Sequence, residues 1–331
     1  MIVIKMSSQT SQKIYLIQIR MVKKMHISVL LNESIAALNL KEDGIYVDCT
    51  LGYAGHSSEI LKRIRRGYLF AIDQDKEAIE YSEKKLSKIS NNFEIIKTNF
   101  ASIKEVLNEK NIQKVDGILF DLGVSSPQLD EVDRGFSYHN DAKLDMRMDS
   151  DQKLSAYDVV NTYSKEKLTK IFFTYGEEKY SSSIAKNIVK YRENKNIETT
   201  LELVEIIKNS IPEKAKRDKH PARRVFQAIR IEVNKELEVL EIALKNSLDL
   251  IGVGGRIVVI TFHSLEDRIV KNIFKDVTNI DKKVKGLPNV PDEYLPNFKL
   301  ITTKAIVPSE EELKLNNRAR SSKLRVIERI K

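Results

Sequence analysis

The chain has 331 residues, 41% of them hydrophobic and 31% charged, so it can bury a core, and its length predicts about two domains. No run approaches the ~20 uncharged apolar residues of a membrane span. The single cysteine, Cys49, excludes an internal disulfide and a cysteine-based zinc cluster. We therefore expect a soluble, cytoplasmic protein that binds no membrane. The 56 Lys and Arg residues outnumber the 47 Asp and Glu residues, and the resulting net charge of +9 is common among proteins that bind nucleic acid.

Residues 1–24 differ from the rest of the chain. They include basic residues but no continuous apolar segment and no small-residue cleavage site, so they do not resemble a signal peptide. Met21 and Met25 both lie close to the first well-patterned segment. We expect residues 1–24 to be a disordered extension or an over-long start.

From Gly44 onward, short apolar runs alternate with amphipathic helical patterns. The runs predict four strands, at residues 45–49, 68–73, 93–96 and 115–121. Helical patterns lie between them, near residues 57–64 and 76–89. Strands and helices that alternate at this spacing predict an α/β fold, in which a parallel sheet is covered by helices on both faces.

The alternation stops after Asp130, and the next ~100 residues show only helical patterns. Ser164 opens a helix that ends at Gly176, and a Thr199/Glu202 capping box opens another. One long helix is then predicted from Ile229 to Ile251, followed by strands at 256–261, 300–304 and 323–327. The sequence thus predicts one α/β domain, at residues 25–134 and 221–331, interrupted by an all-helical domain at 135–220.

Three strand ends in this α/β domain carry residues suited to a cofactor. The first strand leads into a small-residue loop at 50–57, which matches neither GxGxxG nor a Walker A loop. Asp73 ends the second strand, with Asp75 equally available, and Asp121 ends the fourth. Because ligands of open parallel sheets lie outside the carboxyl ends of the strands, these residues predict a nucleotide-type cofactor site, with NAD and S-adenosylmethionine both open.

Several segments together resemble one known family. They are VLLNE (29–33), GHS (55–57), AIDQD (71–75), DGILFDLGVSSPQLD (116–130), RGFS (134–137), LDMRMD (144–149), TFHSLEDR (261–268) and NRARS (317–321). They resemble the ribosomal RNA small-subunit methyltransferase H family, also called MraW, in order over residues 25–331. The resemblance implies a Rossmann-like S-adenosylmethionine-dependent methyltransferase domain with an inserted helical domain. It also implies methylation of the exocyclic N4 of a cytidine in the decoding centre of bacterial 16S rRNA.

The same resemblance implies a set of cofactor-binding residues. Asp73 would bind the ribose, and Phe100 would face the adenine unless it is an ordinary core aromatic. The full set is Ala54, Gly55, His56, Asp73, Phe100, Asp121 and Gln128. The chain departs from the family pattern at Ser28, where a proline is usual, and at Tyr53–Ala54, where glycine is more frequent.

Methyl transfer depends mainly on placing the acceptor nitrogen in line with the methyl group, so few side chains are needed. An acceptor for an N–H of the cytosine amino group would favour attack. The candidates for this catalytic role are Ser125, Ser126, Asp145 and His263. The five histidines are scattered along the chain, and we expect no metal site.

Basic clusters predict the RNA-binding surface. Residues 213–224 have a net charge of +4 and supply the candidates Lys214, Lys216, Arg217, Arg223 and Arg224; residues 314–331 have a net charge of +6. Phe136 and Tyr138 could stack on a splayed cytidine. The predicted partner is 16S rRNA or the small ribosomal subunit, and a homodimer stays open. Two rival functions are a nucleotide-binding oxidoreductase and a non-catalytic RNA-binding factor.

Overall fold

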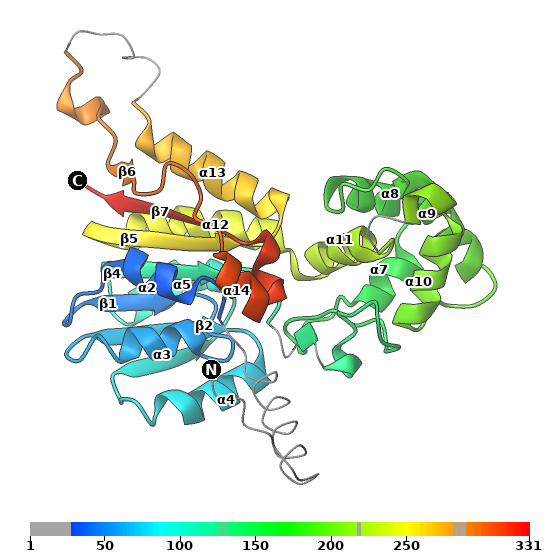
Figure 1. Cartoon of the computed structure of the whole chain (residues 1–331), viewed down its shortest axis with the longest axis horizontal. Coiled ribbons are helices and arrows are strands. Elements are labelled where there is room, and N and C mark those ends of the chain that lie inside the picture. Colours follow the sequence, from blue (N-terminus) through cyan, green and yellow to red (C-terminus); the bar gives the residue numbers. More distant parts are fainter. Residues whose placement is uncertain (1–27, 126–127, 130, 217–219, 281–283, 285–288) are drawn as a thin grey trace, which may run out of the picture.

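The computed structural model describes most of the chain in two lobes. The described residues are 28–125, 128–129, 131–216, 220–280, 284 and 289–331. The predictions for residues 1–24, Ser126 and Arg217 therefore lie outside the described residues. Figure 1 shows a sheet-containing lobe beside a smaller, all-helical one. We call the described residues within 28–125 and 236–331 the α/β lobe and those within 135–234 the helical lobe.

One seven-stranded sheet organises the α/β lobe. Its strands are β1 (Ile45–Asp48), β2 (Tyr68–Asp73), β3 (Phe93–Lys97), β4 (Val115–Asp121), β5 (Ile251–Thr261), β6 (Phe298–Leu300) and β7 (Lys323–Arg329). Their order is β3-β2-β1-β4-β5-β7-β6; β1 to β5 are parallel, and β7 is antiparallel to β5 and β6. The four N-terminal strands and β7 confirm the predictions. The strand predicted at 300–304 is wrong except at Leu300, because the pairing with β7 begins at Phe298.

Helices cover both faces of this sheet, as the α/β class predicts. The helices α5 (Ile103–Glu109), α12 (Glu236–Leu250) and α13 (Ser264–Thr278) pack on one face, and α2 (Leu31–Leu38), α3 (Gly55–Leu61) and α4 (Lys76–Leu86) pack on the other. Neighbouring strand residues point to opposite faces, so in β4 Phe120 joins the first core and Leu119 the second. No helix in the described part of the chain is long and apolar enough to cross a membrane.

The helical lobe has a hydrophobic core of its own. It contains α7 (Ala156–Thr162), α8 (Lys165–Thr174), α9 (Ser181–Arg192), α10 (Thr200–Asn209) and α11 (Arg223–Asn234). The predicted caps are confirmed: the Ser164 hydroxyl accepts a hydrogen bond from the Lys167 N–H, and Thr199 forms a capping box with Glu202. Shorter elements complete the chain, namely η1 (Phe100–Ser102), η2 (Val132–Arg134), η3 (Glu213–Lys216), η4 (Asp292–Tyr294), α14 (Glu310–Leu315) and η5 (Asn317–Ser321).

The single long helix predicted from Ile229 to Ile251 is wrong. The chain forms two helices, α11 and α12, that meet at Lys235, whose φ of 51° lies in the left-handed region. The side-chain amide of Asn234 donates to the carbonyl oxygens of Met146 and Arg230, which fixes this turn. Lysine carries no sequence signal for a left-handed residue, so the apolar periodicity continued unbroken through the turn.

The junction between the lobes bears on the predicted domain boundary at residue 220. The apolar side chains of α11, including Phe226, Ile229 and Val233, pack in the core of the helical lobe. Those of α12, including Leu240 and Leu244, pack against the sheet. We therefore propose that the second boundary lies at Lys235.

Candidate functional site

A cavity of about 540 Å³ lies at the carboxyl ends of β1, β2 and β4, where the helical lobe meets the sheet. Its lining includes the loop after β1, the ends of β2 and β4, the segment after β3, Tyr138 and α11 of the helical lobe, and the C-terminal segment around η5. Of the residues predicted to bind a cofactor, the cavity is lined by Gly55, His56, Asp73, Phe100, Asp121 and Gln128. The structure thus brings nearly the whole predicted set to one place.

The loop after β1 owes its shape to two residues with positive φ. Gly52 has a φ of 46°, and Ala54, at the N-cap of α3, has a φ of 53°. Ala54 is fully buried and is not among the lining residues. A Cβ on Gly55 would lie 1.7 Å from the Ser28 hydroxyl oxygen, so only glycine fits there without movement of Ser28. The loop therefore holds the start of α3, Gly55 and His56, at the cavity.

Asp73 connects the end of β2 to this loop. Its Oδ2 accepts a hydrogen bond from the Gly52 N–H at 2.7 Å, and its Oδ1 accepts one from the Asp75 N–H at 2.9 Å. Burial raises the pKa of Asp73 to about 6. The alternative, Asp75, is buried, caps α4 and pairs with Arg134 at 3.0 Å, outside the cavity. Of the two acids, Asp73 is therefore the one that lines the cavity.

Asp121 is the second acid of the cavity. Its N–H donates to the Thr50 hydroxyl at 2.7 Å, which ties the end of β4 to the loop after β1. Its Oδ1 is buried without a hydrogen-bond partner among the described residues, and its Oδ2 lies 3.6 Å from Nδ1 of His56. Burial, together with the carboxylates of Asp48 and Glu266, raises the pKa of Asp121 well above its usual range. A cationic group of a ligand would relieve this unfavourable environment.

Gln128 and Phe100 complete the wall near the two acids. The side chain of Gln128 donates to Asp75 Oδ2 at 2.7 Å and accepts from the Ser125 N–H at 3.0 Å. It thereby holds the loop after β4, and Ser125 lines the cavity. The Phe100 ring meets Phe120 edge-on, with the ring centroids 5.7 Å apart, and presents an apolar surface to the cavity.

Asp145 and His263 are not among the residues that line this cavity. Asp145 forms a two-point ion pair with Arg147, both contacts at 2.8 Å. His263 is the N-cap of α13 and forms a capping box with Glu266. Both side chains therefore support local structure beside the site.

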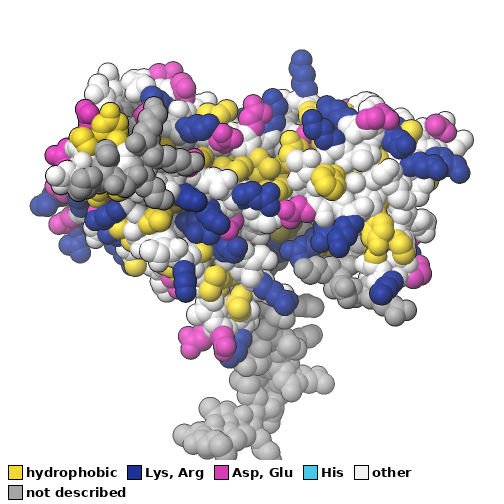
Figure 2. Space-filling view, turned by 90° about the horizontal axis from the view of Figure 1, so that it is seen from above, with side chains coloured by type: hydrophobic (Ala, Val, Ile, Leu, Met, Phe, Trp, Pro, Cys, Tyr) yellow, Lys and Arg dark blue, Asp and Glu magenta, His cyan; other side chains and the backbone are white. Residues whose placement is uncertain are grey.

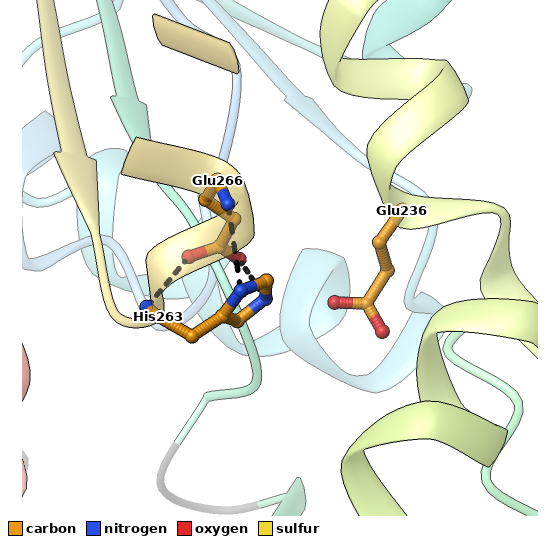
Figure 3. A group of neighbouring side chains, drawn as sticks. All are labelled: Glu236, His263 and Glu266. Atoms are coloured by element: carbon orange, nitrogen blue, oxygen red, sulfur yellow. Dashed lines mark hydrogen bonds and ion pairs between the residues drawn. The ribbon is translucent and has the colours of Figure 1, made fainter. Parts of the chain in front are cut away.

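His263 also belongs to a group that could be mistaken for a metal centre. Figure 3 shows Glu236, from the start of α12, facing the His263 ring, with Glu266 beside that ring, and ligand atoms of the three lie within 4.8 Å of one another. However, both oxygens of Glu236 pair with Arg230 at 2.8 Å. Glu266 Oε2 accepts from the Phe262 N–H at 2.8 Å. Because these bonds occupy both carboxylates, we interpret the group as an ionic network that joins α11, α12 and α13.

Arginines from both lobes also line the cavity. Arg223 and Arg230 come from α11, and Arg318 and Arg320 come from the C-terminal segment. In the view from above, Lys and Arg side chains lie on both lobes, around the hollow between them (Figure 2). The other RNA-binding candidates lie elsewhere: Lys214, Lys216 and Arg224 are not lining residues, Lys216 pairs with Glu213, and Arg224 lies 3.9 Å from Glu178.

Sequence reasoning missed two parts of the lining. Arg230 was placed on a helix but not in the site, although it lies seven residues, about two helical turns, after Arg223 and so on the same face. Asn317 and Ser321 were noted only as a motif. They reach the cavity because β7 runs antiparallel to β5 and brings the preceding segment to the carboxyl end of the sheet.

Comparison with known proteins identifies this architecture. The sequence matches the MraW methylase family over residues 23–330. The chain belongs to the MraW methylase family. S-adenosylmethionine is therefore its methyl donor, and the family supports rRNA methylation as its general activity.

More distant similarity extends to solved structures. An rRNA methylase from Streptococcus thermophilus is 10% identical, with 91% of this chain and 94% of that chain covered and a TM-score of 0.41. An S-adenosylmethionine-dependent O-methyltransferase from Thermotoga maritima is 9% identical, with 95% and 70% covered and a TM-score of 0.41. The family match, rather than these similarities, carries the assignment.

Proposed function

We propose that this MraW-family chain transfers a methyl group from S-adenosylmethionine to the exocyclic N4 of a cytidine in the decoding centre of bacterial 16S rRNA. The observation that carries the proposal is a single cavity lined by the acidic strand ends Asp73 and Asp121, here called the acidic wall, and by arginines from both lobes. A cationic methyl donor suits the acidic wall, and a polyanionic acceptor suits the arginines. The cytosine and its place in 16S rRNA rest on the resemblance of segments such as 116–130. An rRNA substrate would place the protein in the cytoplasm.

The side chains of the acidic wall fit S-adenosylmethionine. Its ammonium group would pair with the orphaned Oδ1 of Asp121, and the charge would lower that raised pKa. Asp73 would accept hydrogen bonds from the ribose hydroxyls, and Phe100 would pack on the adenine. Gly55 allows the backbone of the loop to approach the donor.

When bound, S-adenosylmethionine supplies an electrophilic methyl group. The task of the protein is then to orient the cytosine amino group, which is a poor nucleophile because its lone pair is conjugated with the ring. An acceptor for one N–H would favour the attacking geometry. Of the four candidates for this role, Ser125 lines the cavity and is the one that the geometry favours, and Ser126 lies outside the described residues. Asp145 and His263 would act only by supporting the surrounding segments.

The test is identification of the methylated nucleoside. The protein is incubated with methyl-labelled S-adenosylmethionine and, in parallel, with 16S rRNA or small subunits that lack the modification. After digestion, we expect labelled N4-methylcytidine, and the better substrate of the two identifies the natural one. Label in C5-methylcytidine or in a 2′-O-methylated nucleoside would contradict the proposal.

A further inference from the structure

One aromatic side chain of the helical lobe, Tyr138, lines the cavity but has no role in the proposed binding of S-adenosylmethionine. The Tyr138 ring lines the cavity and stacks on His220, with centroids 4.5 Å apart and an interplanar angle of 18°. Its edge meets Phe226, a buried core residue, at 5.7 Å. His139 lies tilted beside it at 4.5 Å. Tyr138 is therefore held in place by the helical lobe, whereas the other sequence candidate, Phe136, is buried in the core.

A cation lies close to this aromatic group. The Arg223 N–H donates to the His220 carbonyl oxygen at 3.1 Å, so α11 begins one turn after the residue that stacks on Tyr138. Arg223 is exposed and lines the cavity. Its neighbour Arg224 is equally exposed but faces Glu178 and does not line it. Two adjacent arginines thus have different surroundings, which provides a matched pair for experiment.

A second cation faces the cavity from the other lobe. Arg320 lies in η5 (Asn317–Ser321), is exposed and lines the same cavity. In Figure 1 the C-terminal segment around α14 lies at the side of the α/β lobe that faces the helical lobe. Arginines from segments almost a hundred residues apart in the sequence therefore line one cavity.

We propose that Tyr138, Arg223 and Arg320 form the binding site for the target nucleotide of a single-stranded RNA segment. The base packs on Tyr138, and the two arginines bind the phosphates on either side of it. Aromatic packing combined with cations along the backbone is the usual way of holding single-stranded RNA. The site deepens the proposed function and rests on it for the identity of the ligand as RNA. The site also takes residues from both lobes, so the helical lobe is needed to form it.

The experiment measures the affinity of a fluorescent decoding-region RNA fragment at several salt concentrations. Arg223→Ala and Arg320→Ala are each expected to weaken binding and to reduce the slope of log K against log salt by ~0.7, the value for one phosphate contact on a single strand. Arg224→Ala is the matched control and is expected to leave the slope unchanged. Tyr138→Ala is expected to weaken binding about 5- to 150-fold with an unchanged slope, because stacking is not ionic.

Folding is controlled by the affinity for S-adenosylmethionine, which all four variants are expected to keep. If Tyr138→Ala loses its affinity for S-adenosylmethionine, the measurement is repeated with Tyr138→Leu, which retains apolar contact with Phe226. Weakened RNA binding by that variant supports the site. Equal slopes for Arg223→Ala and Arg224→Ala, or unchanged RNA affinity in the Tyr138 variant, would overturn it. Failure of the proposed function is distinguishable, because it would appear as a wrong methylated nucleoside made by the unmodified protein.

Discussion

Replacement of Asp73 by alanine tests the cofactor wall at the residue whose environment is best defined. A charge-assisted hydrogen bond contributes about 1.5–3 kcal/mol, so loss of the carboxylate that we propose binds the ribose is expected to weaken S-adenosylmethionine binding about 10- to 150-fold. Stability is expected to change little. The variant leaves the N–H groups of Gly52 and Asp75 without their acceptor, at ~1–3 kcal/mol each. The variant also removes a carboxylate that is ionised near neutral pH. Because its pKa is raised from 3.8 to about 6, this ionised group destabilises the folded state by about 3 kcal/mol, and its removal offsets the lost hydrogen bonds.

The measurement is isothermal titration calorimetry with S-adenosylmethionine, combined with thermal unfolding. Asp116→Ala is the matched control, because Asp116 accepts from the Ile45 N–H at 3.0 Å near the opposite end of β4 and is not a lining residue. We expect that variant to lose stability and keep its affinity. An unchanged affinity in Asp73→Ala would refute the assignment of Asp73 to the ribose.

Three further predictions concern pH, packing and domain structure. Because the proposed ribose acceptor is the ionised form of Asp73 and its pKa is about 6, calorimetry is expected to show S-adenosylmethionine affinity falling as the pH drops below 6, by up to ~10-fold per unit from this group. Asp73→Asn should reduce this dependence and leave the part that comes from Asp121, whose pKa is also raised. Gly55→Ala is expected to lower the free energy of unfolding, measured by urea denaturation, by ~1–3 kcal/mol. A second change, Ser28→Gly, is expected to restore part of this loss. No rescue would mean that the Ser28 side chain is not the obstacle. Deletion of residues 135–234 with a short linker is expected to leave a folded core that binds the donor. Deletion of 135–220 exposes the apolar face of α11, so this variant is expected to aggregate. Equal behaviour of the two variants in size-exclusion chromatography would place the boundary elsewhere.

The parts of the fold predicted correctly are those set by local pattern. The strand at 68–73 has an apolar run bounded by polar residues, and the helix at Thr199 has the two residues of its capping box three positions apart. The strand and the start of the helix were therefore predicted correctly. The break at Lys235 was missed because it depends on the contacts of Asn234 with a loop some 90 residues earlier. The start of β5 was placed too late, since Gly254 and Gly255 suggested a turn where the strand already runs.

The same distinction holds for the site. The residues at the strand ends, such as Asp73 and Asp121, were predicted because parallel topology brings strand ends together. Arg230, Asn317 and Ser321 were missed because their proximity arises from packing between lobes and from the antiparallel β7, neither of which leaves a local signal. The choice between Asp73 and Asp75 also required the structure, which engages Asp75 with Gln128 and Arg134.

The most direct test of the central claim is the position of the methyl group in 16S rRNA. After methylation of unmodified small subunits with labelled S-adenosylmethionine, protection of chosen segments by complementary DNA, nuclease digestion and mass spectrometry locate the labelled nucleotide. We expect a single N4-methylated cytidine within the decoding centre. A label outside that region, or on any atom other than N4 of a cytidine, would contradict it.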